Sequence, residues 1–480
     1  MVVISDLFAK IRRAFGDYAV DKRLLQEAEI SKLPGFVAEY LMTEFSMNYP
    51  SDWLERLRDF VKRHYFEASE KEYVKHMLVE RRKIAIIDEL RIWVDLEAGE
   101  HRGIIPTIGE VDVRVPADLA RKYQMAMITG MWGLIELEYS PDTAKRGPNG
   151  ELLENPVVVV GFKPFQAPTS DPEILRDARQ YFTLDEWLDV LLNTVGYNHS
   201  AYQTVEKKLA VLSRLLPIVE ENTHLAEFGP KATGKTFIFR NVSRYTRIIV
   251  GGMISPAALF YNLRTGIPGE VAVRDAVVFD EISKVRFPNP DEIVAKLKDF
   301  MESGQYERGK QRVTSGCSIV MLGNVEVEER EGAYVPVEDF TYILPKPMRD
   351  SALIDRIHGV IPGWVLPKIR QARYHLSQGF GIALDYFSEA MHTMRKESLV
   401  GEMSKHIEVA GNITIRDERA IKKMMSAFIK ILFPNLYFDN RELEIVAEFV
   451  VEMRQRVRDW LHKLSPGEFP KDTISVTVRS

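Results

Sequence analysis

Apolar residues recur at helical intervals in the first part of the chain. In the segment WLERLRDFVKRHYF (53–66), Trp53, Leu57 and Val61 fall on one side of a 3.6-residue repeat. Proline-containing breaks interrupt the pattern, which indicates several helices rather than one long helix. We therefore expect residues 1–81 to form an α-helical N-terminal domain.

Between residues 82 and 166 the helical pattern gives way to short β-like runs separated by turn signals. An Asn-Gly pair at 149–150 favours a tight hairpin turn. Several short strands joined by turns predict a small β-barrel, which resembles the OB-fold. The runs are KIAIID (83–88), RIWVDL (91–96), VDVRV (111–115), LIELEY (134–139) and NPVVVVGF (155–162).

The second half of the chain is marked off by a proline-rich segment, PFQAPTSDP at 164–172, which is typical of a linker. Helical patterns follow, and the first of them begins with a capping-box pair, Thr183 and Glu186. A succession of wholly apolar strands then predicts a parallel α/β core. The expected division is 167–219 for linker and helices, 220–370 for the core, and 371–480 for a helical C-terminal part.

The composition is that of an ordinary globular protein, with 45% hydrophobic and 28% charged residues. The net charge is −5, so contact with nucleic acid has to come from local basic patches. The single cysteine, Cys317, excludes an intrachain disulfide and suits a reducing compartment. We find neither a signal peptide nor an apolar run long enough to cross a bilayer, and expect a cytoplasmic protein without membrane contact.

A phosphate-binding loop is evident at residues 229–236, which match G-x-x-x-x-G-K-[ST] in full. The loop follows a predicted strand and precedes a predicted helix, which is the context that this motif requires. Its N–H groups are expected to surround phosphates, while Lys235 reaches the β- and γ-phosphates and Thr236 binds Mg²⁺. The residues expected to bind the nucleotide are Gly229, Pro230, Lys231, Ala232, Thr233, Gly234, Lys235 and Thr236.

A second element of the nucleotide site is an apolar run, Ala-Val-Val-Phe, that ends in Asp280 and Glu281. The run fits a buried parallel strand. Asp280 is expected to hold Mg²⁺, and Glu281 to orient and deprotonate the attacking water. Buried strands often end in acids, so the motif takes its weight from its position downstream of Lys235.

Two polar residues further along have two interpretations each. Asn324 ends an apolar strand, and it is either a turn-forming residue or the side chain that positions water beside the γ-phosphate. Its order in the chain favours the second role. Arg356 either forms a surface ion pair with Asp355 or Asp350, or reaches the γ-phosphate of a neighbouring subunit's nucleotide. Arg349 competes with it for that role.

These elements, in this order, resemble AAA+ ATPases, and a closer resemblance is to the BrxL family, the Lon-like AAA+ factors of BREX phage-defence systems. It covers nearly the whole chain, and its most specific motifs are IPGW and MESGxxxRGK. The resembling segments are PGFVAEYLMTEF (34–45), HYFEASEKEYVKHMLVERRK (64–83), FGPKATGKT (228–236), LFYN (259–262), VVFDEI (277–282), MESGQYERGK (301–310) and DRIHGVIPGW (355–364).

The resemblance implies an α/β fold in which an AAA+ P-loop core with a helical lid follows an α-helical N-terminal domain and an OB-like barrel. It implies an ATPase that uses ATP and Mg²⁺, forms a homo-oligomeric ring (a hexamer or stacked rings), binds double-stranded DNA and acts with other BREX proteins. Family members usually carry a C-terminal domain similar to the Lon protease domain. The sequence ends before such a domain, so we expect no proteolysis from these residues.

The motor core is also similar to that of MCM helicases, and this similarity assigns roles to single residues. By analogy, Asn324 is the sensor-1 residue and Arg356 is the arginine finger that acts on a neighbouring subunit. Arg416 lies where a sensor-2 arginine could bind the nucleotide. Arg419 is close by in the sequence, and an exposed charged helix face also explains both arginines.

A basic hairpin is predicted at residues 304–316, between the second and third elements of the nucleotide site. In MCM-like ATPases a hairpin at this place projects into the ring's pore. The resemblance then implies that Arg308, Lys310 and Arg312 contact DNA phosphates without reading the base sequence. The alternative is a solvated charged loop.

Two further basic features are candidates for DNA contact. Lys145 and Arg146 lie at the tip of the hairpin expected in the barrel. The segment that runs from Arg264 to Arg274 is either an insertion of the type that MCM proteins carry or an ordinary connection.

Three functions fit these observations. The leading hypothesis is an ATP-driven ring motor on double-stranded DNA in phage defence. A Lon-related protein unfoldase is the second, but pore loops of unfoldases usually present an aromatic residue, and Tyr306, the only aromatic residue of the predicted hairpin, is surrounded by charge. The third is an assembly scaffold gated by nucleotide.

Overall fold

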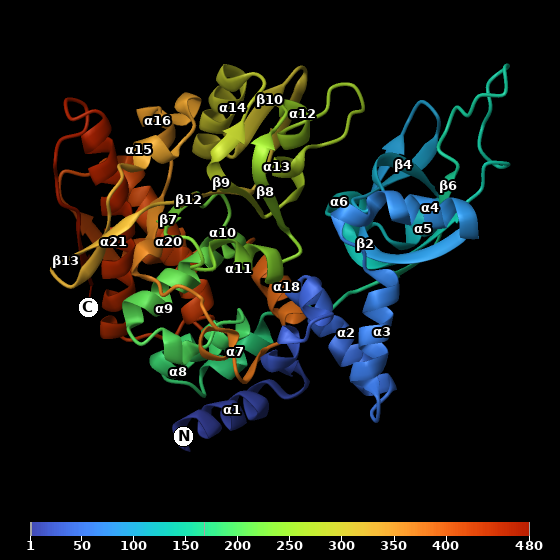
Figure 1. The fold of residues 1–480 in the computed structure, drawn as a ribbon. Helices are drawn as coiled ribbons and strands as arrows, with labels where there is room; N and C mark the ends of the chain where they lie inside the picture. The colour runs from blue at the N-terminus through green and yellow to red at the C-terminus, as the bar shows by residue number, and fades with distance from the viewer. Residues whose placement is uncertain (1, 168, 480) are drawn as a thin grey trace. The chain divides into compact units, whose positions relative to one another are not determined.

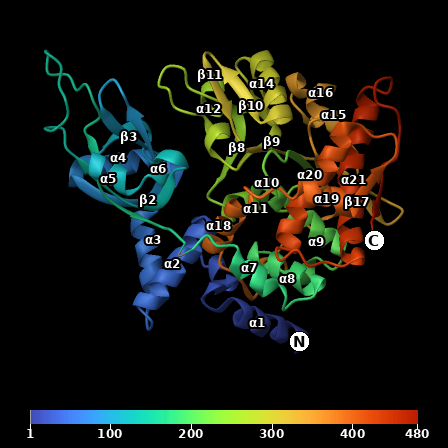
Figure 2. The ribbon, with the colours of Figure 1, turned by 180° about the vertical axis from the view of Figure 1, so that it is seen from behind.

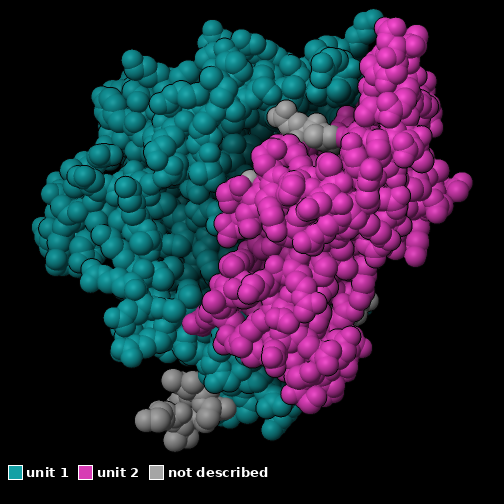
Figure 3. All heavy atoms as spheres, turned by 45° about the vertical axis from the view of Figure 1, so that its right-hand side comes forward, with its two compact units in different colours: residues 1–24, 169–480 teal, residues 25–168 magenta. Residues whose placement is uncertain are grey.

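The computed structural model describes residues 2–167 and 169–479, and the chain divides into two compact units (Figures 1–3). Residues 25–168 form the smaller unit, and residues 1–24 with 169–480 form the larger one. The first helix belongs to the larger unit because Lys10 forms an ion pair with Glu186, at 2.7 Å. The helices between residues 35 and 81 share a unit with the barrel, so the units do not divide at residue 81.

The smaller unit is built on a closed five-stranded barrel in the order β2-β3-β4-β6-β5. β4 and β6 are its parallel pair, and apolar side chains fill its interior. The predicted barrel is thus confirmed, although the two runs expected as separate strands at 83–88 and 91–96 form one strand. The strands are β2 (Lys83–Asp95), β3 (Glu100–Ile105), β4 (Gly109–Val115), β5 (Met131–Tyr139) and β6 (Val157–Pro164).

Helices complete the smaller unit, as the periodicity of its first residues predicts. One strand was missed: β3 has the sequence EHRGII, whose polar first half hides the alternating pattern. The short helices between β4 and β5 were not predicted either. The helices are α2 (Gly35–Asn48), α3 (Trp53–His64), α4 (Lys71–Arg81), α5 (Ala117–Lys122) and α6 (Met125–Ile128).

The larger unit is organised around a parallel sheet in the order β15-β7-β12-β9-β8. Its central strands β7 and β12 are mostly apolar and almost wholly buried, which confirms the predicted parallel α/β core. All of its strands run in one direction, so their carboxyl ends lie at one edge and their amino ends at the other. The strands are β7 (Leu225–Gly229), β8 (Thr246–Met253), β9 (Ala276–Arg286), β12 (Ser318–Asn324) and β15 (Gly359–Pro362).

Helices surround this sheet, and the two longest, α20 and α21, come last in the chain (Figure 1). Thr183 and Glu186 form the predicted capping box at the start of α8. The helices are α1 (Val2–Phe15), α7 (Glu173–Arg179), α8 (Leu184–Thr194), α9 (Val205–Leu212), α10 (Leu216–Val219), α11 (Lys235–Asn241), α12 (Pro256–Leu259), α13 (Glu270–Val273), α14 (Pro290–Ser303), α15 (Phe340–Ile343), α16 (Ser351–Ile354), α17 (Ala372–His375), α18 (Leu384–Met394), α19 (Val400–His406), α20 (Ile415–Leu432) and α21 (Asn440–Leu464).

Four antiparallel strand pairs lie outside the main sheet of the larger unit. The pair β10–β11 is the hairpin predicted at 304–316, whereas the hairpin β13–β14 was not predicted. The pairs are β1 (Ala19–Asp21) with β16 (Phe380–Ile382), β10 (Gln305–Arg308) with β11 (Gln311–Thr314), β13 (Val327–Arg330) with β14 (Ala333–Pro336), and β17 (Ile407–Ala410) with β18 (Ser475–Val478).

The predicted linker at 164–172 begins where β6 ends, and α7 starts directly after it. Residue 168, inside this linker, lies outside the described residues. Over residues 2–167 and 169–479, no helix has both the length and the apolar character that crossing a bilayer requires.

Candidate nucleotide site

The phosphate-binding loop connects the carboxyl end of β7 to the first residue of α11. Backbone crowding explains its glycines. A side chain on Gly234 would place its Cβ 2.3 Å from the Tyr197 hydroxyl, and Gly234 also has a φ of +75°. A Cβ on Gly229 would lie 2.6 Å from the backbone of Gly363. Both positions therefore require glycine.

Lys235 points its ammonium group back into the loop. Its Nζ donates to the carbonyl oxygens of Gly229, at 2.9 Å, and Pro230, at 2.8 Å. The side chain is buried, and burial lowers its pKa while the charge of Glu227 opposes that effect. A buried ammonium favours an anionic partner, and phosphate oxygens can take the place of the two carbonyls.

The two residues predicted to hold Mg²⁺ are brought together. The Thr236 hydroxyl donates to Oδ2 of Asp280 at 2.7 Å, and Oδ1 of Asp280 accepts from the backbone N–H of Glu281 at 2.9 Å. A hydroxyl and a carboxylate oxygen are ligands that suit Mg²⁺, which retains several waters in such sites. The donor set fits a magnesium ion.

Strand β9 continues to Arg286 instead of ending at Asp280, as the apolar run suggested. Its pairing with β12 ends at Phe279, so Asp280 is the point at which β9 leaves its neighbour. Glu281 then takes a φ of +48° and accepts a hydrogen bond from Lys284 at 2.8 Å. This hydrogen bond lowers the pKa of the Glu281 carboxyl.

Asn324 lies beside the start of the phosphate-binding loop. In the parallel pairing of β12 with β7 it stands opposite Gly229, and the N–H of Val325 donates to the Gly229 carbonyl at 3.2 Å. The site therefore gathers Lys235, Thr236, Asp280 and Asn324 at the carboxyl edge of the sheet, where α/β proteins bind their ligands.

A buried ion pair, which the sequence analysis did not predict, supports the phosphate-binding loop. Arg214 binds both carboxylate oxygens of Glu227, at 2.9 and 2.7 Å, and both side chains are fully buried. The same guanidinium donates to the carbonyls of Thr233, at 3.2 Å, and Gly234, at 3.3 Å. The Tyr197 hydroxyl donates to the Gly234 carbonyl as well. A lone glutamate inside an apolar strand was the signal that could have revealed this support.

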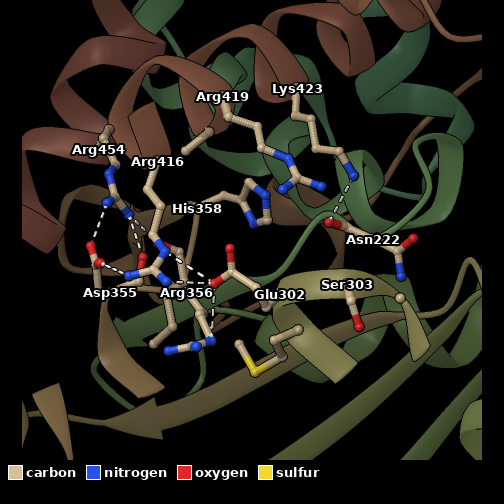
Figure 4. A pocket seen from close by; sticks show the side chains of 14 residues that line it. Asn222, Glu302, Ser303, Asp355, Arg356, His358, Arg416, Arg419, Lys423 and Arg454 are labelled. Atoms are coloured by element: carbon tan, nitrogen blue, oxygen red, sulfur yellow. Dashed lines mark hydrogen bonds and ion pairs between the residues drawn. The ribbon is translucent and has the colours of Figure 1, made fainter. Parts of the chain in front are cut away.

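The predicted arginines lie at the opposite edge of the sheet, in a small cavity of about 50 Å³ (Figure 4). Asn222, which precedes β7, and His358, which precedes β15, line this cavity. It therefore opens at the amino ends of the strands, whereas the phosphate-binding loop follows a carboxyl end. Arg356 and Arg416 both project into it, and β7 separates them from the loop of their own chain.

Acidic side chains hold these arginines in place. The Glu302 carboxylate lies 3.2 Å from Nε of Arg356 and accepts from Nε of Arg416 at 3.0 Å. Arg416 also donates to Asp355 at 2.8 Å. Arg356 thus pairs with Glu302 and not with Asp355 or Asp350, the partners expected from its neighbourhood in the sequence.

Arg349, the competing finger candidate, has backbone partners. Its guanidinium donates to the carbonyls of Leu344, at 3.0 Å, and Tyr342, at 3.2 Å. Both carbonyls lie on the segment just before Arg349, so its head group is turned toward its own chain. Arg356 likewise donates to a carbonyl of its own chain, that of Ala352, but its side chain lines the cavity and that of Arg349 does not.

The basic residues of the β10–β11 hairpin, which is predicted to contact DNA, differ in their exposure to solvent. Lys310 at the tip and Arg312 on β11 are exposed, and Arg312 contacts the side chain of Gln305 at 3.1 Å. Arg308 is half-buried and donates to the Tyr261 carbonyl. The Arg308 guanidinium is therefore partly engaged in a hydrogen bond within the fold.

Tyr306 of the same hairpin is buried in the core, and its hydroxyl donates to the Phe260 carbonyl at 2.7 Å. The segment that contains Arg264 packs beside the hairpin, since a side chain on Gly309 would come within 2.8 Å of Leu263. The predicted third basic feature therefore borders the hairpin, and Arg264 is exposed there.

Lys145 and Arg146 lie in the connection between β5 and β6 of the barrel, where Arg146 pairs with Leu152 across a hairpin-like turn. The Lys145 ammonium forms an ion pair with Glu100. Arg146 donates to the carbonyls of Gly150, at 3.0 Å, and Pro141, at 3.3 Å. Both side chains therefore already have bonding partners within the barrel.

Comparison with known proteins identifies two family regions. Residues 157–475 match the family described as "Lon-like protease BrxL-like, ATPase domain", and residues 13–139 match "BREX system Lon protease-like protein BrxL N-terminal". The chain belongs to the BrxL family. The region matching the BrxL ATPase domain contains the phosphate-binding loop, Asp280 and the arginine cavity, whereas the region matching the BrxL N-terminal domain contains four of the five barrel strands.

Two curated BrxL proteins show the same relationship. The chain is 29% identical over 469 residues to the "Lon-like protease BrxL" of Escherichia coli O9:H4 (strain HS), covering 97% of this chain and 66% of that protein. It is 29% identical over 475 residues to the protein of the same name from Bacillus cereus (strain H3081.97), covering 97% and 68%. The chain thus spans about two thirds of the length of these BrxL relatives.

Proposed function

We propose that this chain is an Mg²⁺-dependent ATPase of the AAA+ type, which assembles into a homo-oligomeric ring on double-stranded DNA and acts in BREX defence with other BREX proteins. The observation that carries the proposal is the convergence of Lys235, Thr236 and Asp280 at the carboxyl edge of the parallel sheet. Membership of the BrxL family, with its ATPase domain, supports the choice of ATP.

Each residue of the site has a role in hydrolysis. The loop N–H groups and Lys235 would bind the phosphates, and Thr236 and Asp280 would hold Mg²⁺, which would supply neutralising charge. Glu281 takes the proton of the attacking water. Asn324, beside Gly229, orients that water.

Arg356 completes the site of a neighbouring subunit. It lies at the amino edge of the sheet, away from the loop of its own chain, so its guanidinium serves a second copy. A contact of one edge with the opposite edge of a neighbour is heterologous, and such contacts form a ring when the rotation between copies closes. Arg416 shares Glu302 with Arg356 and would approach the same nucleotide, in the manner of a sensor-2 residue that acts on the neighbour.

DNA contact is assigned to the β10–β11 hairpin and its border. Lys310, Arg312 and Arg264 are exposed there, and basic residues of this kind bind phosphates without reading sequence. Arg308 contributes less, because it is bonded to Tyr261. The barrel has the five strands of an OB-like nucleic-acid platform, with Lys145 and Arg146 in the connection between its last two strands.

A protein unfoldase is the weaker alternative. Gripping a polypeptide needs an accessible aromatic or apolar residue, and the hairpin's aromatic side chain, Tyr306, is buried and bonded to Phe260. The exposed residues of the hairpin itself are polar or charged, although Leu263 on the bordering segment is an exposed apolar side chain. This arrangement supports a polyanion as the substrate.

The test is ATP hydrolysis and duplex binding by the wild type and a Lys310→Ala/Arg312→Ala variant. We expect linear duplex DNA to stimulate wild-type hydrolysis. The variant should lose duplex affinity, and the slope of log K against log[salt] should fall by about 2, while basal hydrolysis persists. Arg308→Ala serves as the matched control and should change the slope by less. Stimulation by unfolded protein but not by DNA would reverse the assignment.

A further inference from the structure

The arginine cavity carries more positive charge than one phosphate contact needs. Five cationic side chains line it against two carboxylates. Glu302 and Asp355 are already shared among Arg356, Arg416 and Arg454. The cationic side chains are Arg356, Arg416, Arg419, Lys423 and Arg454.

Arg419 and Lys423 form the part of this cavity that the nucleotide roles leave unexplained. They stand one turn apart on α20, and Figure 4 shows both projecting into the cavity. Arg419 is exposed, and no ion pair within residues 2–167 and 169–479 includes it. Lys423 donates to the carbonyls of Glu221 and Asn222, and burial lowers its pKa to about 8. An acidic partner beside them would restore favourable charge pairing.

The strongest acidic feature of the larger unit is the β13–β14 hairpin with its flanks, residues 326–339. It carries six carboxylates and a single basic residue, Arg330. Glu326, Glu329, Glu331 and Glu338 are exposed, and so are the apolar side chains of Tyr334 and Val337, at 55% and 53%. An exposed hairpin that combines charge with apolar side chains is suited to docking.

The hairpin begins directly at the nucleotide site. It follows Asn324 and Val325, and the latter is bonded to Gly229 of the phosphate-binding loop at 3.2 Å. At its base, Val327 packs with Trp364 on the core of the sheet. The hairpin therefore flanks the phosphate-binding loop, as Arg419 flanks Arg356 at the other edge.

We infer that the acidic β13–β14 hairpin of one copy docks against Arg419 and Lys423 in the arginine cavity of the next copy. The inference rests on the proposed function, in which Arg356 reaches the phosphates bound by a neighbour. Bringing Arg356 to that loop also brings Arg419 and Lys423 toward the flanking hairpin. The two surfaces have opposite charge, so the contact selects the correct face of the neighbour and aligns the arginine finger.

A charge exchange tests the contact. The variants are Glu329→Lys/Glu331→Lys on the hairpin, Arg419→Glu on α20, and their combination; Glu444→Lys/Glu448→Lys on the exposed side of α21 is the control with a matched change in charge. Sedimentation velocity with Mg²⁺ and a non-hydrolysable ATP analogue measures assembly. We expect the hairpin variant and Arg419→Glu each to raise the concentration needed for assembly about tenfold or more, and the combination to restore most of it. The control should assemble like the wild type.

Each other outcome has a distinct meaning. If the combined variant assembles no better than its parents, the docking contact is overturned. If Arg419→Glu impairs hydrolysis while the hairpin variant assembles normally, Arg419 serves the phosphate instead, and the inference also fails. A wild type that stays monomeric with nucleotide contradicts the proposed ring itself, which is a separate result.

Cross-linking gives a second readout that does not depend on stability. The single native cysteine, Cys317, is buried and leaves a low background. Chains with Glu329→Cys and chains with Arg419→Cys are mixed with the nucleotide analogue and oxidised. We expect disulfide-linked dimers in the mixture and not in either chain alone, and their absence from rings that have assembled contradicts the contact.

Discussion

The two edges of the parallel sheet carry charge in different ways. At the carboxyl edge, Lys235, Thr236 and Asp280 contact one another or the loop, and a buried ion pair beneath the loop fixes them. At the amino edge, Arg356 and Arg416 converge on Glu302, but no loop of their own chain brings a phosphate to them. The carboxyl edge brings its residues together within one chain, whereas the amino edge, in the proposed function, supplies the arginine that the site of a second copy needs.

The difference also concerns the buried charges. Arg214 is paired with a single acid, Glu227, and also donates to the loop carbonyls. It therefore links β7 to the phosphate-binding loop. Arg454 instead joins Asp355 and Asp417 at 2.8 and 2.7 Å, and so connects α21 to α20 and to the segment before β15. The Arg214–Glu227 pair supports the phosphate-binding loop. Arg454 with Asp355 and Asp417 instead supports the segments that carry Arg356 and Arg416.

The largest effect on activity is expected from Arg356. Its substitution by Ala should lower ATP hydrolysis by about 10³-fold or more, because an arginine finger stabilises charge that develops in the transition state. Nucleotide binding to the chain's own loop should persist. Arg349→Ala, whose guanidinium is bonded to nearby carbonyls, is the matched control and should retain most of the activity. Steady-state hydrolysis and binding of a fluorescent ATP analogue measure both quantities; the reverse ranking of the two variants would exchange their roles.

Removing Arg214 should have the largest effect on stability. Arg214→Ala leaves Glu227 buried without a partner, so we expect the free energy of unfolding to fall by about 3–5 kcal/mol. The affinity for ATP should fall as well, since the Thr233 and Gly234 carbonyls lose their donor. Urea unfolding followed by tryptophan fluorescence measures the first effect.

The control for this pair is the double variant Arg214→Met/Glu227→Gln, which removes both charges. It should recover much of the stability and little of the ATP affinity. Equal recovery of both properties would contradict the proposed support of the loop.

A smaller effect is expected from acid at the amino edge. His224 and His358 are buried there, and burial, followed by the charge of Lys423 for His224, holds the pKa of each imidazole well below its ordinary value. Arg419 and Arg454 also face them and act in the same direction. Both imidazoles are neutral in the folded chain, and the backbone N–H of His224 donates to Nδ1 of His358 at 3.0 Å.

The sign of the pH dependence follows from this neutrality. Below about pH 6.5 the unfolded chain binds protons that the folded chain does not, so stability falls as pH falls, by up to about 1.4 kcal/mol per pH unit for each histidine. His358→Asn, whose side-chain oxygen can accept the same hydrogen bond, should flatten the dependence. Thermal midpoints between pH 7.5 and about 5.5 test it; equal slopes for the variant and the wild type would contradict it.

Elements with a local signal could be predicted from the sequence. The phosphate-binding loop, the strand that ends at Asn324 and the β10–β11 hairpin each have a pattern that depends on adjacent residues, and the structure confirms their secondary structure. The barrel could be predicted as a class, but β3 could not, because its alternation is broken by charge. Features that depend on residues adjacent in the sequence can therefore be predicted from it.

Contacts across long separations could not be predicted. The partner of Arg356 is Glu302, and both neighbours favoured by the sequence, Asp355 and Asp350, are bonded elsewhere, to Arg416 and Lys298. The sequence suggests that Tyr306 belongs to a charged loop, but strand pairing directs its side chain into the core. Which side of a hairpin is buried depends on the layer beneath it, and this layer comes from other parts of the chain.

The most direct test of the account is a mixing experiment with two inactive chains. Lys235→Ala removes the carboxyl-edge half of the site, and Arg356→Ala removes the amino-edge half. Each variant alone should be nearly inactive, whereas an equal mixture should recover about a quarter of the wild-type hydrolysis, because about a quarter of the interfaces then join an intact loop to an intact arginine. A mixture no more active than its components would contradict a nucleotide site shared between two copies.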